Sequence, residues 1–290
     1  MRKAPNARSR RGELVLTIRV LTVDDIPVGL SLKEKAGWNQ LEADWRRLLE
    51  LQPDVCFLAE SDGVGVGTVT TCQFGPVAWI AMMLVDEAYR RRGIGRALMT
   101  RALDELDCQG VRTVRLDATP KGRPMYESLG FVAEATLDRY RGVFPPGDGP
   151  AGPQAVPELD AVIALDRQVT GTDRERLIRR LAWEHPESLR VVRTGRETSG
   201  FLMSRPGSTA RQIGPCIADE QAGRLLLADA SSRYAGETVL FDIPTANFTA
   251  KKLVGSWGLR AERVLMRMGR GPRVEEDLNR IWASSGPEKG

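Results

Sequence analysis

Hydrophobic and polar positions follow two alternating periods along the first part of the chain. Short apolar, β-branched runs predict strands, and apolar residues at helical spacing predict helices between them. The predicted strands lie at 14–20, 55–60, 66–73, 77–85 and 114–119, and near Phe131 and Leu137. The predicted helices lie at 24–36, 39–51 and 95–107, and around 123–129. Early strands followed by alternating strands and helices predict an α/β fold, a mixed sheet with helices on both faces.

The second part of the chain repeats this order of elements. Helices are predicted at 158–169, 174–183, 220–231 and 246–256, and strands at 238–243 and near 190–193, 200–204 and 211–218. The stretch 143–153 between the two parts is rich in Pro and Gly, which is typical of a connector. We therefore divide the chain into a basic, disordered arm (1–13), a first domain (14–142), a linker (143–157), a second domain (158–270) and a C-terminal tail (271–290).

The turn between the strand at 77–85 and the helix at 95–107 carries a chemical signal. It is an arginine-rich stretch with two glycines, Arg90-Arg91-Arg92-Gly93-Ile94-Gly95-Arg96. Backbone N–H groups at a helix N-terminus favour an anion, and the glycines leave room for its close approach. The turn lacks the Gly-Lys-Ser/Thr ending of a nucleoside-triphosphate loop. We expect it to bind a pyrophosphate.

This turn and the stretch Tyr126-Glu127-Ser128-Leu129-Gly130-Phe131 resemble two elements of the GNAT (Gcn5-related) N-acetyltransferases. Nearly the whole chain is similar to two-domain bacterial members whose carboxy-terminal part is a YitH-like acetyltransferase domain. The resemblance implies acetyl-CoA as the cofactor, held by the end of a strand and by the turn. The residues implied are Leu84, Val85, Arg90, Arg91, Arg92, Gly93, Ile94, Gly95, Arg96 and Thr119.

A fixed spacing relates the two domains and indicates a duplicated fold. Thr119, Gly122, Met125, Tyr126, Gly130 and Phe131 recur at the same intervals as Asn247, Ala250, Leu253, Val254, Gly258 and Leu259. Val254 stands where the first domain has Tyr126, and the stretch 219–224 leaves no room for an Arg-x-x-Gly-x-Gly turn. We therefore expect a tandem GNAT acyl-CoA N-acyltransferase fold whose second copy is degenerate.

Tyr126 is the candidate general acid, because an ordinary tyrosine pKa near 10 keeps its hydroxyl protonated at neutral pH. The base is less well defined. Many relatives carry a glutamate on the strand before the phosphate turn, but the stretch 77–85 contains no carboxylate. Asp117 is our candidate base, and Glu42, Asp44 and a chain of water molecules are left open as alternatives.

The acceptor amine is expected to bind beside Trp38, Asn39 and Gln40, which lie between two predicted helices, and beside Trp79. His185 is the single histidine of the chain. Because the chain has only this one histidine, a Ser-His-Asp triad and a histidine metal cluster are nearly excluded, and no metal is predicted.

These observations predict a cytoplasmic, acetyl-CoA-dependent N-acetyltransferase that transfers an acetyl group directly to a primary amine of a small molecule or peptide. The alternatives are a larger acyl-CoA or aminoacyl-tRNA donor, which the basic first residues would suit, and a non-catalytic CoA-binding module. The net charge of +4 does not demand a nucleic-acid partner, and no apolar run reaches the ~20 residues of a membrane span. The four scattered cysteines indicate a reducing compartment. A homodimer is left open.

Overall fold

The computed structural model describes residues 16–146 and 159–290. The predicted arm and most of the predicted linker lie outside the described residues. Strands of the first half are β1 (Leu16–Val20), β2 (Phe57–Ser61), β3 (Val64–Phe74), β4 (Val77–Val85), β5 (Thr113–Ala118) and β6 (Val132–Val143). Its helices are α1 (Ile26–Lys35), α2 (Glu42–Leu51), α3 (Ile94–Cys108) and α4 (Arg123–Glu127).

From its first helix onward, the second half has the same order of elements as the first, with one further strand at its end and no counterpart of β1 among the described residues. Its helices are α5 (Leu159–Thr170), α6 (Glu175–Glu184), α7 (Glu220–Arg233) and α8 (Phe248–Ser256). Its strands are β7 (Arg190–Thr194), β8 (Glu197–Arg205), β9 (Arg211–Ala218), β10 (Thr238–Pro244), β11 (Arg260–Arg270) and β12 (Ile281–Ala283). Short 3₁₀ turns lie at Val23–Asp25, Glu87–Tyr89 and Pro186–Ser188.

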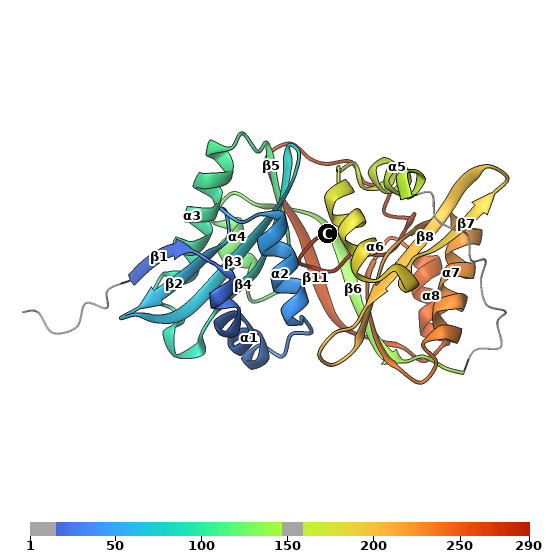
Figure 1. The fold of residues 1–290 in the computed structure, drawn as a ribbon, viewed down its shortest axis with the longest axis horizontal. Coiled ribbons are helices and arrows are strands. Elements are labelled where there is room, and N and C mark those ends of the chain that lie inside the picture. The colour runs from blue at the N-terminus through green and yellow to red at the C-terminus, as the bar shows by residue number, and fades with distance from the viewer. Residues whose placement is uncertain (1–15, 147–158) are drawn as a thin grey trace, which may run out of the picture.

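The predicted mixed α/β sheet is confirmed, but its strands are shared between the halves. Among the described residues one 12-stranded sheet has the order β1-β2-β3-β4-β5-β11-β6-β10-β9-β8-β7, with β12 beside β9. The last long strand of each half has therefore crossed into the other: β11 pairs with β5, and β6 pairs with β10. Figure 1 shows this antiparallel β11–β6 pair running between the two halves.

Two buried ion pairs hold the exchanged strands. On one side Asp117 of β5 accepts hydrogen bonds from Arg267 of β11 at 3.0 and 3.2 Å. On the other side Asp242 of β10 accepts from Arg139 of β6 at 2.7 and 2.8 Å. Arg139 and Arg267 are 128 positions apart, which is the spacing that relates the two halves elsewhere. Their partners Asp117 and Asp242 are 125 positions apart, so a similar but not identically spaced Asp–Arg pair stands at each junction.

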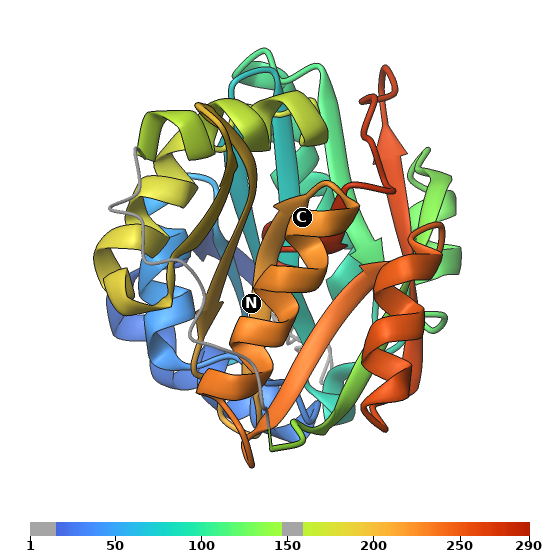
Figure 2. The same cartoon turned by 90° about the vertical axis from the view of Figure 1, so that its right-hand side faces the viewer.

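Helices cover both faces of the sheet, and the hydrophobic core follows that division. One cluster joins α1 and α2 of the first half to α5 and α6 of the second across one face. On the other face, α3 and α4 pack on the first half and α7 and α8 on the second, in two separate clusters. Figure 2 shows α5–α6 and α7–α8 on opposite sides of the strands. The shared cluster and the exchanged strands make the two halves one packed unit.

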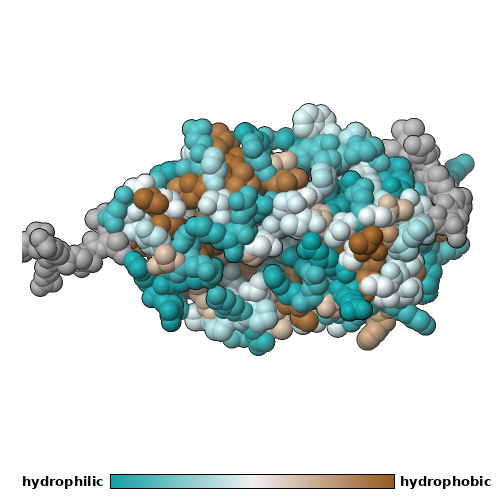
Figure 3. Space-filling view, turned by 90° about the horizontal axis from the view of Figure 1, so that it is seen from below, coloured by the Kyte–Doolittle hydropathy of each residue, from teal (hydrophilic) through white to brown (hydrophobic). Residues whose placement is uncertain are grey.

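The apolar residues that predicted α3 from the sequence form the face of the helix that packs on the sheet. Ile94, Leu98, Ala102 and Leu106 recur every four positions and are buried against the sheet. The face in Figure 3 is mostly hydrophilic, with hydrophobic side chains in separate groups. In the described part of the chain, no helix combines the length and the apolar character that a bilayer span requires.

Candidate functional site

A cavity of about 690 Å³ opens in the first half because β4 and β5 separate. These parallel strands pair only where Val77–Trp79 lie beside Thr113–Arg115. Beyond that point, an irregularity in β4 opposite Val69 interrupts the β3–β4 register, and Met82 has a φ of 44°. Thr68 Oγ1 donates to the Met82 carbonyl at 2.8 Å and holds the irregularity in place. The cavity lies between the diverging strands.

One end of the cavity is the N-terminus of α3. Gly93 is its N-cap residue, with a φ of 82°, and it provides no side-chain cap. The described residues supply no acceptor for the backbone N–H groups of 91–96, and the first helical bond runs from Ala97 N to the Gly93 carbonyl. These N–H groups and the helix dipole make this end suited to an anion.

Nearly all the residues predicted to hold the cofactor line this cavity. They are Leu84, Val85, Arg90, Arg91, Gly93, Ile94, Gly95, Arg96 and Thr119. Arg92 is not among the lining residues: its guanidinium stacks over the Tyr89 ring and donates to the Ala88 carbonyl at 3.0 Å. A Cβ atom on Gly95 would meet the side chains of Met83, Met125 and Val85, at 3.3, 3.4 and 3.7 Å, whereas a Cβ on Gly93 would meet no atom within 4 Å. The two glycines therefore place no side chain of their own on this part of the wall.

Tyr126 lies on the cavity wall, on α4. Its ring packs edge-on against Phe131, with centroids 6.1 Å apart, and the described residues form no hydrogen bond with its hydroxyl. Burial raises the pKa of Tyr126 to about 12. The hydroxyl therefore stays protonated at neutral pH and is able to donate into the cavity.

Asp117 also belongs to the wall of the cavity, but its carboxylate is turned away from the open space. Its side chain is 0 % exposed, and Arg267 binds both carboxylate oxygens. The second half contains a similar pair, Asp242 with Arg139, which has no arginine-rich turn beside it. The role of Asp117 as a base remains a prediction, and its pairing with Arg267 favours a structural role in holding β11.

The four residues predicted for the acceptor pocket separate into two groups. Trp38 and Gln40 line the cavity. Asn39 instead binds a loop of the second half: its Oδ1 accepts from the backbone N–H groups of Thr209 and Ala210, at 2.9 and 3.0 Å. Trp79 is not a lining residue, and its indole donates to the Pro287 carbonyl at 3.1 Å.

The sequence reasoning missed the residues that the exchanged strands and the last residues of the chain bring to the cavity. Arg139 on β6, Arg263 and Leu265 on β11, and Glu288 near the end of the chain all line it. The strand β11 had not been predicted, although residues 264–268 form an apolar run interrupted only by Arg267. That short apolar run was the available signal for Leu265. No local pattern marks Glu288.

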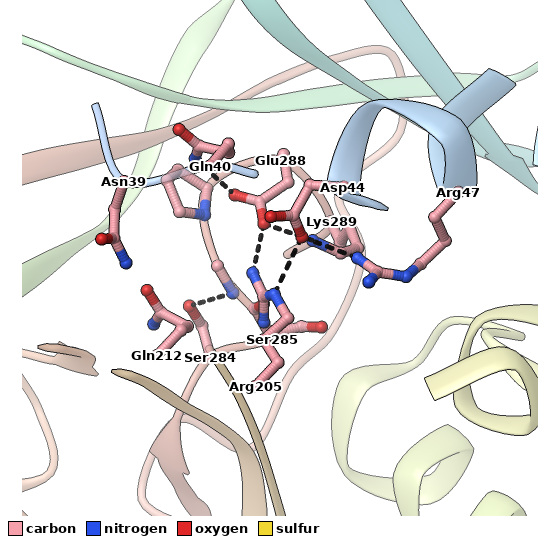
Figure 4. Close-up of polar contacts among 12 residues, drawn as sticks. Asn39, Gln40, Asp44, Arg47, Arg205, Gln212, Ser284, Ser285, Glu288 and Lys289 are labelled. Carbon is pink, nitrogen blue, oxygen red and sulfur yellow. Dashed lines mark hydrogen bonds and ion pairs between the residues drawn. The ribbon is translucent and has the colours of Figure 1, made fainter. Parts of the chain in front are cut away.

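Glu288 belongs to a buried cluster of charges between the halves (Figure 4). Its Oε1 accepts from Arg205 and Lys289, and Arg205 also donates to Asp44 at 3.0 Å. Burial opposes ionisation of Glu288, but Lys289 and Arg205 outweigh it and hold the pKa of Glu288 at about 2. Burial, assisted by Arg205, lowers the pKa of Lys289 to about 8. Glu288 is therefore a carboxylate at neutral pH.

The second half has a corresponding cleft, and its own chain fills it. β9 and β10 pair only where Arg211 and Gln212 lie beside Val239 and Leu240. β12 lies against β9 in the space between the diverging strands, and Trp282 is fully buried there. At the helix N-terminus, Asp219 caps α7 by accepting from Ala222 N at 2.8 Å. A carboxylate thus occupies the position that is free for an anion in the first half.

The chain matches two family models, one in each half. Residues 29–131 match the acetyltransferase (GNAT) family, and residues 162–283 match an acetyltransferase (GNAT) domain. The [ribosomal protein bS18]-alanine N-acetyltransferase of Escherichia coli K12 is 43% identical over 142 residues, which cover 46% of this chain and 90% of that protein. The chain therefore belongs to the GNAT family of N-acetyltransferases, as the sequence resemblance implied.

Two further relatives and two solved structures cover other shares of the chain. The uncharacterized N-acetyltransferase YitH of Bacillus subtilis is 25% identical over 65% of this chain and 68% of its own length. The chain spans about half, 54%, of the N-alpha-acetyltransferase MAK3 of Arabidopsis thaliana, at 35% identity over 33% of this chain. A putative acetyltransferase from Pyrococcus horikoshii has a TM-score of 0.82 at 28% identity, covering 98% of this chain and 100% of that one. A tandem GNAT protein from the clavulanic acid biosynthesis pathway shares the fold, with a TM-score of 0.64 at 16% identity over 89% of this chain and 100% of that one. The tandem fold is confirmed.

Proposed function

We propose that this protein transfers an acetyl group from acetyl-CoA directly to a primary amine of a small molecule or peptide. The first half binds the cofactor and performs the reaction. The observation that carries the proposal is the uncapped N-terminus of α3, which lies at one end of a cavity that also contains Tyr126. The second half lacks both features, because Asp219 caps its helix and Val254 replaces the tyrosine.

The residues present fit acetyl-CoA. The backbone N–H groups of 91–96 would take its pyrophosphate, and Gly93 and Gly95 put no side chain on this part of the cavity wall. Arg91 lines the same end and supplies positive charge. When bound, acetyl-CoA supplies the thioester whose acetyl group is transferred.

Tyr126 would act as the general acid. Its hydroxyl holds a proton up to a high pH, because its pKa is about 12, and it opens on the cavity without another partner in the described residues. Holding the two reactants together in one cavity removes up to about 7–11 kcal/mol of the barrier in well-oriented cases. The positions of Trp38 and Gln40 on the wall support an acceptor site beside them.

A peptide or protein amine is one acceptor class to test first, because the Escherichia coli relative is named for the alanine of a ribosomal protein. The four cysteines are free thiols, which supports a reducing compartment such as the cytoplasm. A suitable panel contains three amines: spermidine, glucosamine and a hexapeptide whose first residue is alanine. The readout is thiol release from acetyl-CoA.

Calorimetry of acetyl-CoA binding tests the cofactor site. We expect Arg92→Glu with Gly95→Glu to abolish measurable binding, because two carboxylates would replace positive charge and open space at the phosphate end. Gly95→Glu alone should account for most of the loss, since Arg92 does not line the cavity. Gly255→Glu is the matched control, because a Cβ at Gly255 meets no atom within 4 Å. Normal binding by the double variant would refute the placement.

A further inference from the structure

The chain segment 279–285 is seated in the cleft of the second half as a ligand would be. The Asn247 side chain donates to the carbonyls of Asn279 and Ile281, at 2.9 and 3.0 Å. The Asp242 carbonyl accepts from Ser284 N at 2.8 Å. Trp282 lies directly on Gly223, where an added Cβ would come within 2.0 Å of its indole. This segment is held from both sides of the cleft.

Gly223 follows Gly95 by 128 positions, the spacing that relates the two halves. Gly95 lines the open cavity of the first half, with Met83 and Met125 as its nearest side chains, whereas Trp282 packs directly on Gly223 in the second half. The indole therefore occupies the part of the second cleft that corresponds to the cofactor end of the first.

Beyond this seat, the chain returns to the first half. The Pro287 carbonyl accepts from the Trp79 indole at 3.1 Å, and Gly290 packs on the same ring. Pro287 and Glu288 then complete the wall of the first cavity. Figure 1 shows this end of the chain between the halves.

Glu288 lies at the end of the cavity remote from the phosphate turn. Trp79 contacts the segment at the point where β4 and β5 begin to diverge, and the phosphate turn follows Val85. Trp79 and Val85 are six positions apart on β4, a distance of about 20 Å along an extended strand. A cofactor anchored at the turn leaves the region near Glu288 for a second molecule.

The Glu288 carboxylate keeps capacity for a further donor. Its Oε1 is taken by Arg205 and Lys289. Its Oε2 accepts only from Gln40 Nε2, at 3.2 Å, among the described residues. An ionised carboxylate oxygen accepts more than one hydrogen bond, and an amine is rich in N–H groups. Gln40 lines the cavity too and orients this oxygen.

We propose that Glu288 determines acceptor specificity by binding the N–H groups of the acceptor amine, and that docking of residues 279–285 in the second half's cleft places it there. This inference rests on the proposed function. It gives the second half a definite task, which is to anchor the segment that completes the acceptor end of the first cavity.

The alternative is that Glu288 only balances the charges of the buried cluster, and two variants separate these roles. Glu288→Gln removes the acceptor contact and also leaves Lys289 with Asp44, at 3.7 Å, as its remaining anionic partner. Glu288→Gln with Lys289→Gln removes one charge of each sign and restores the balance. A purely structural role predicts that the double variant recovers normal kinetics, whereas an acceptor role predicts that it does not.

The experiment measures the KM for each amine of the panel and the Kd for acetyl-CoA in the full chain. We expect both variants to raise the amine KM by about 10- to 100-fold, the effect of one hydrogen bond to a charged group. The acetyl-CoA Kd should stay within twofold. Glu288→Asp should recover part of the loss. Trp282→Ala should raise the amine KM in the same way, while Trp257→Ala, which loses a ring packed on Phe144, should not.

The outcomes are distinguishable. A normal amine KM in the double variant overturns the acceptor role of Glu288 and leaves the proposed function intact. A normal amine KM in Trp282→Ala overturns the anchoring role. If the wild-type chain binds acetyl-CoA but acetylates no amine of the panel, the proposed function fails, and this inference fails with it.

Discussion

The two clefts of this molecule have the same frame and opposite contents. In each half a pair of parallel strands separates after two or three residue pairs, and a helix N-terminus faces the gap. In the first half that terminus is uncapped and the cavity is open. In the second half Asp219 caps the helix and β12 with Trp282 fills the space. A cleft of this fold can thus be used for a ligand or for the protein's own packing.

The difference depends on a few residues at matching positions. Gly95 and Gly223 are both glycines, yet one borders the cavity and the other supports an indole. Glycine conservation between the two copies therefore says nothing about which cleft binds a cofactor. The arginines of the turn and the tyrosine on α4 carry that distinction.

Tyr126→Phe tests the chemistry of the open cleft and should have the largest effect. Loss of a general acid lowers kcat by about 10²–10⁴-fold, with little change in acetyl-CoA binding. Because the pKa of Tyr126 is about 12, the wild-type rate should show no fall from tyrosine ionisation between pH 7 and 10. Val254→Ala, at the matching position of the second half, is the control and should leave kcat unchanged. A kcat within threefold of wild type would remove Tyr126 from the reaction.

Asp117→Asn and Asp242→Asn compare the two Asp–Arg pairs. Asp242→Asn leaves Arg139 without its anionic partner, so it should destabilise the protein by about 3–5 kcal/mol in urea unfolding. Asp117→Asn should cost less, because Arg267 keeps Glu276 as a partner at 3.0 Å. Activity at a temperature where both variants are folded should then be similar. A far larger fall in kcat for Asp117→Asn than for Asp242→Asn would restore Asp117 as the base and contradict a structural role.

Gly223→Ala and Gly95→Ala compare the filled and the open cleft at one position, with the smallest expected effect. The methyl group at 223 would collide with Trp282, and overpacking of this kind costs about 1–3 kcal/mol of stability. At 95 the methyl group meets two flexible methionine ends, so stability should change little while acetyl-CoA binds more weakly. Equal stability losses in the two variants, measured by thermal unfolding, would mean that the clefts are not filled differently.

The local parts of the site could be read from the sequence. The arginines and glycines of the turn, the helix that follows and the Tyr126–Phe131 stretch lie within a few residues of one another, so their pattern is visible along the chain. The spacing that relates the two halves also reappears in the structure. Thr119 Oγ1 accepts from Gly122 N at 3.3 Å, and Asn247 Oδ1 accepts from Ala250 N at 3.0 Å. The duplication was therefore predictable.

The contacts made by two of the residues expected at the acceptor site could not be predicted from local patterns. Trp79 and Asn39 were expected at the acceptor site, but Trp79 supports the returning chain and Asn39 holds a loop of the second half. Their partners lie 208 and 170 positions away. A single sequence contains no periodicity that links residues at such distances.

The sequence by itself determined the fold class, the duplication and the arginine- and glycine-rich turn before α3, because each depends on neighbouring residues and on the periods of helices and strands. Only the tertiary structure decided the exchange of β6 and β11, the burial of Asp117 against Arg267, and the arrival of Glu288 in the first cavity. These features are contacts between segments that the chain brings together only on folding. Their energy comes from burial and charge pairing in the assembled core, which local patterns do not encode.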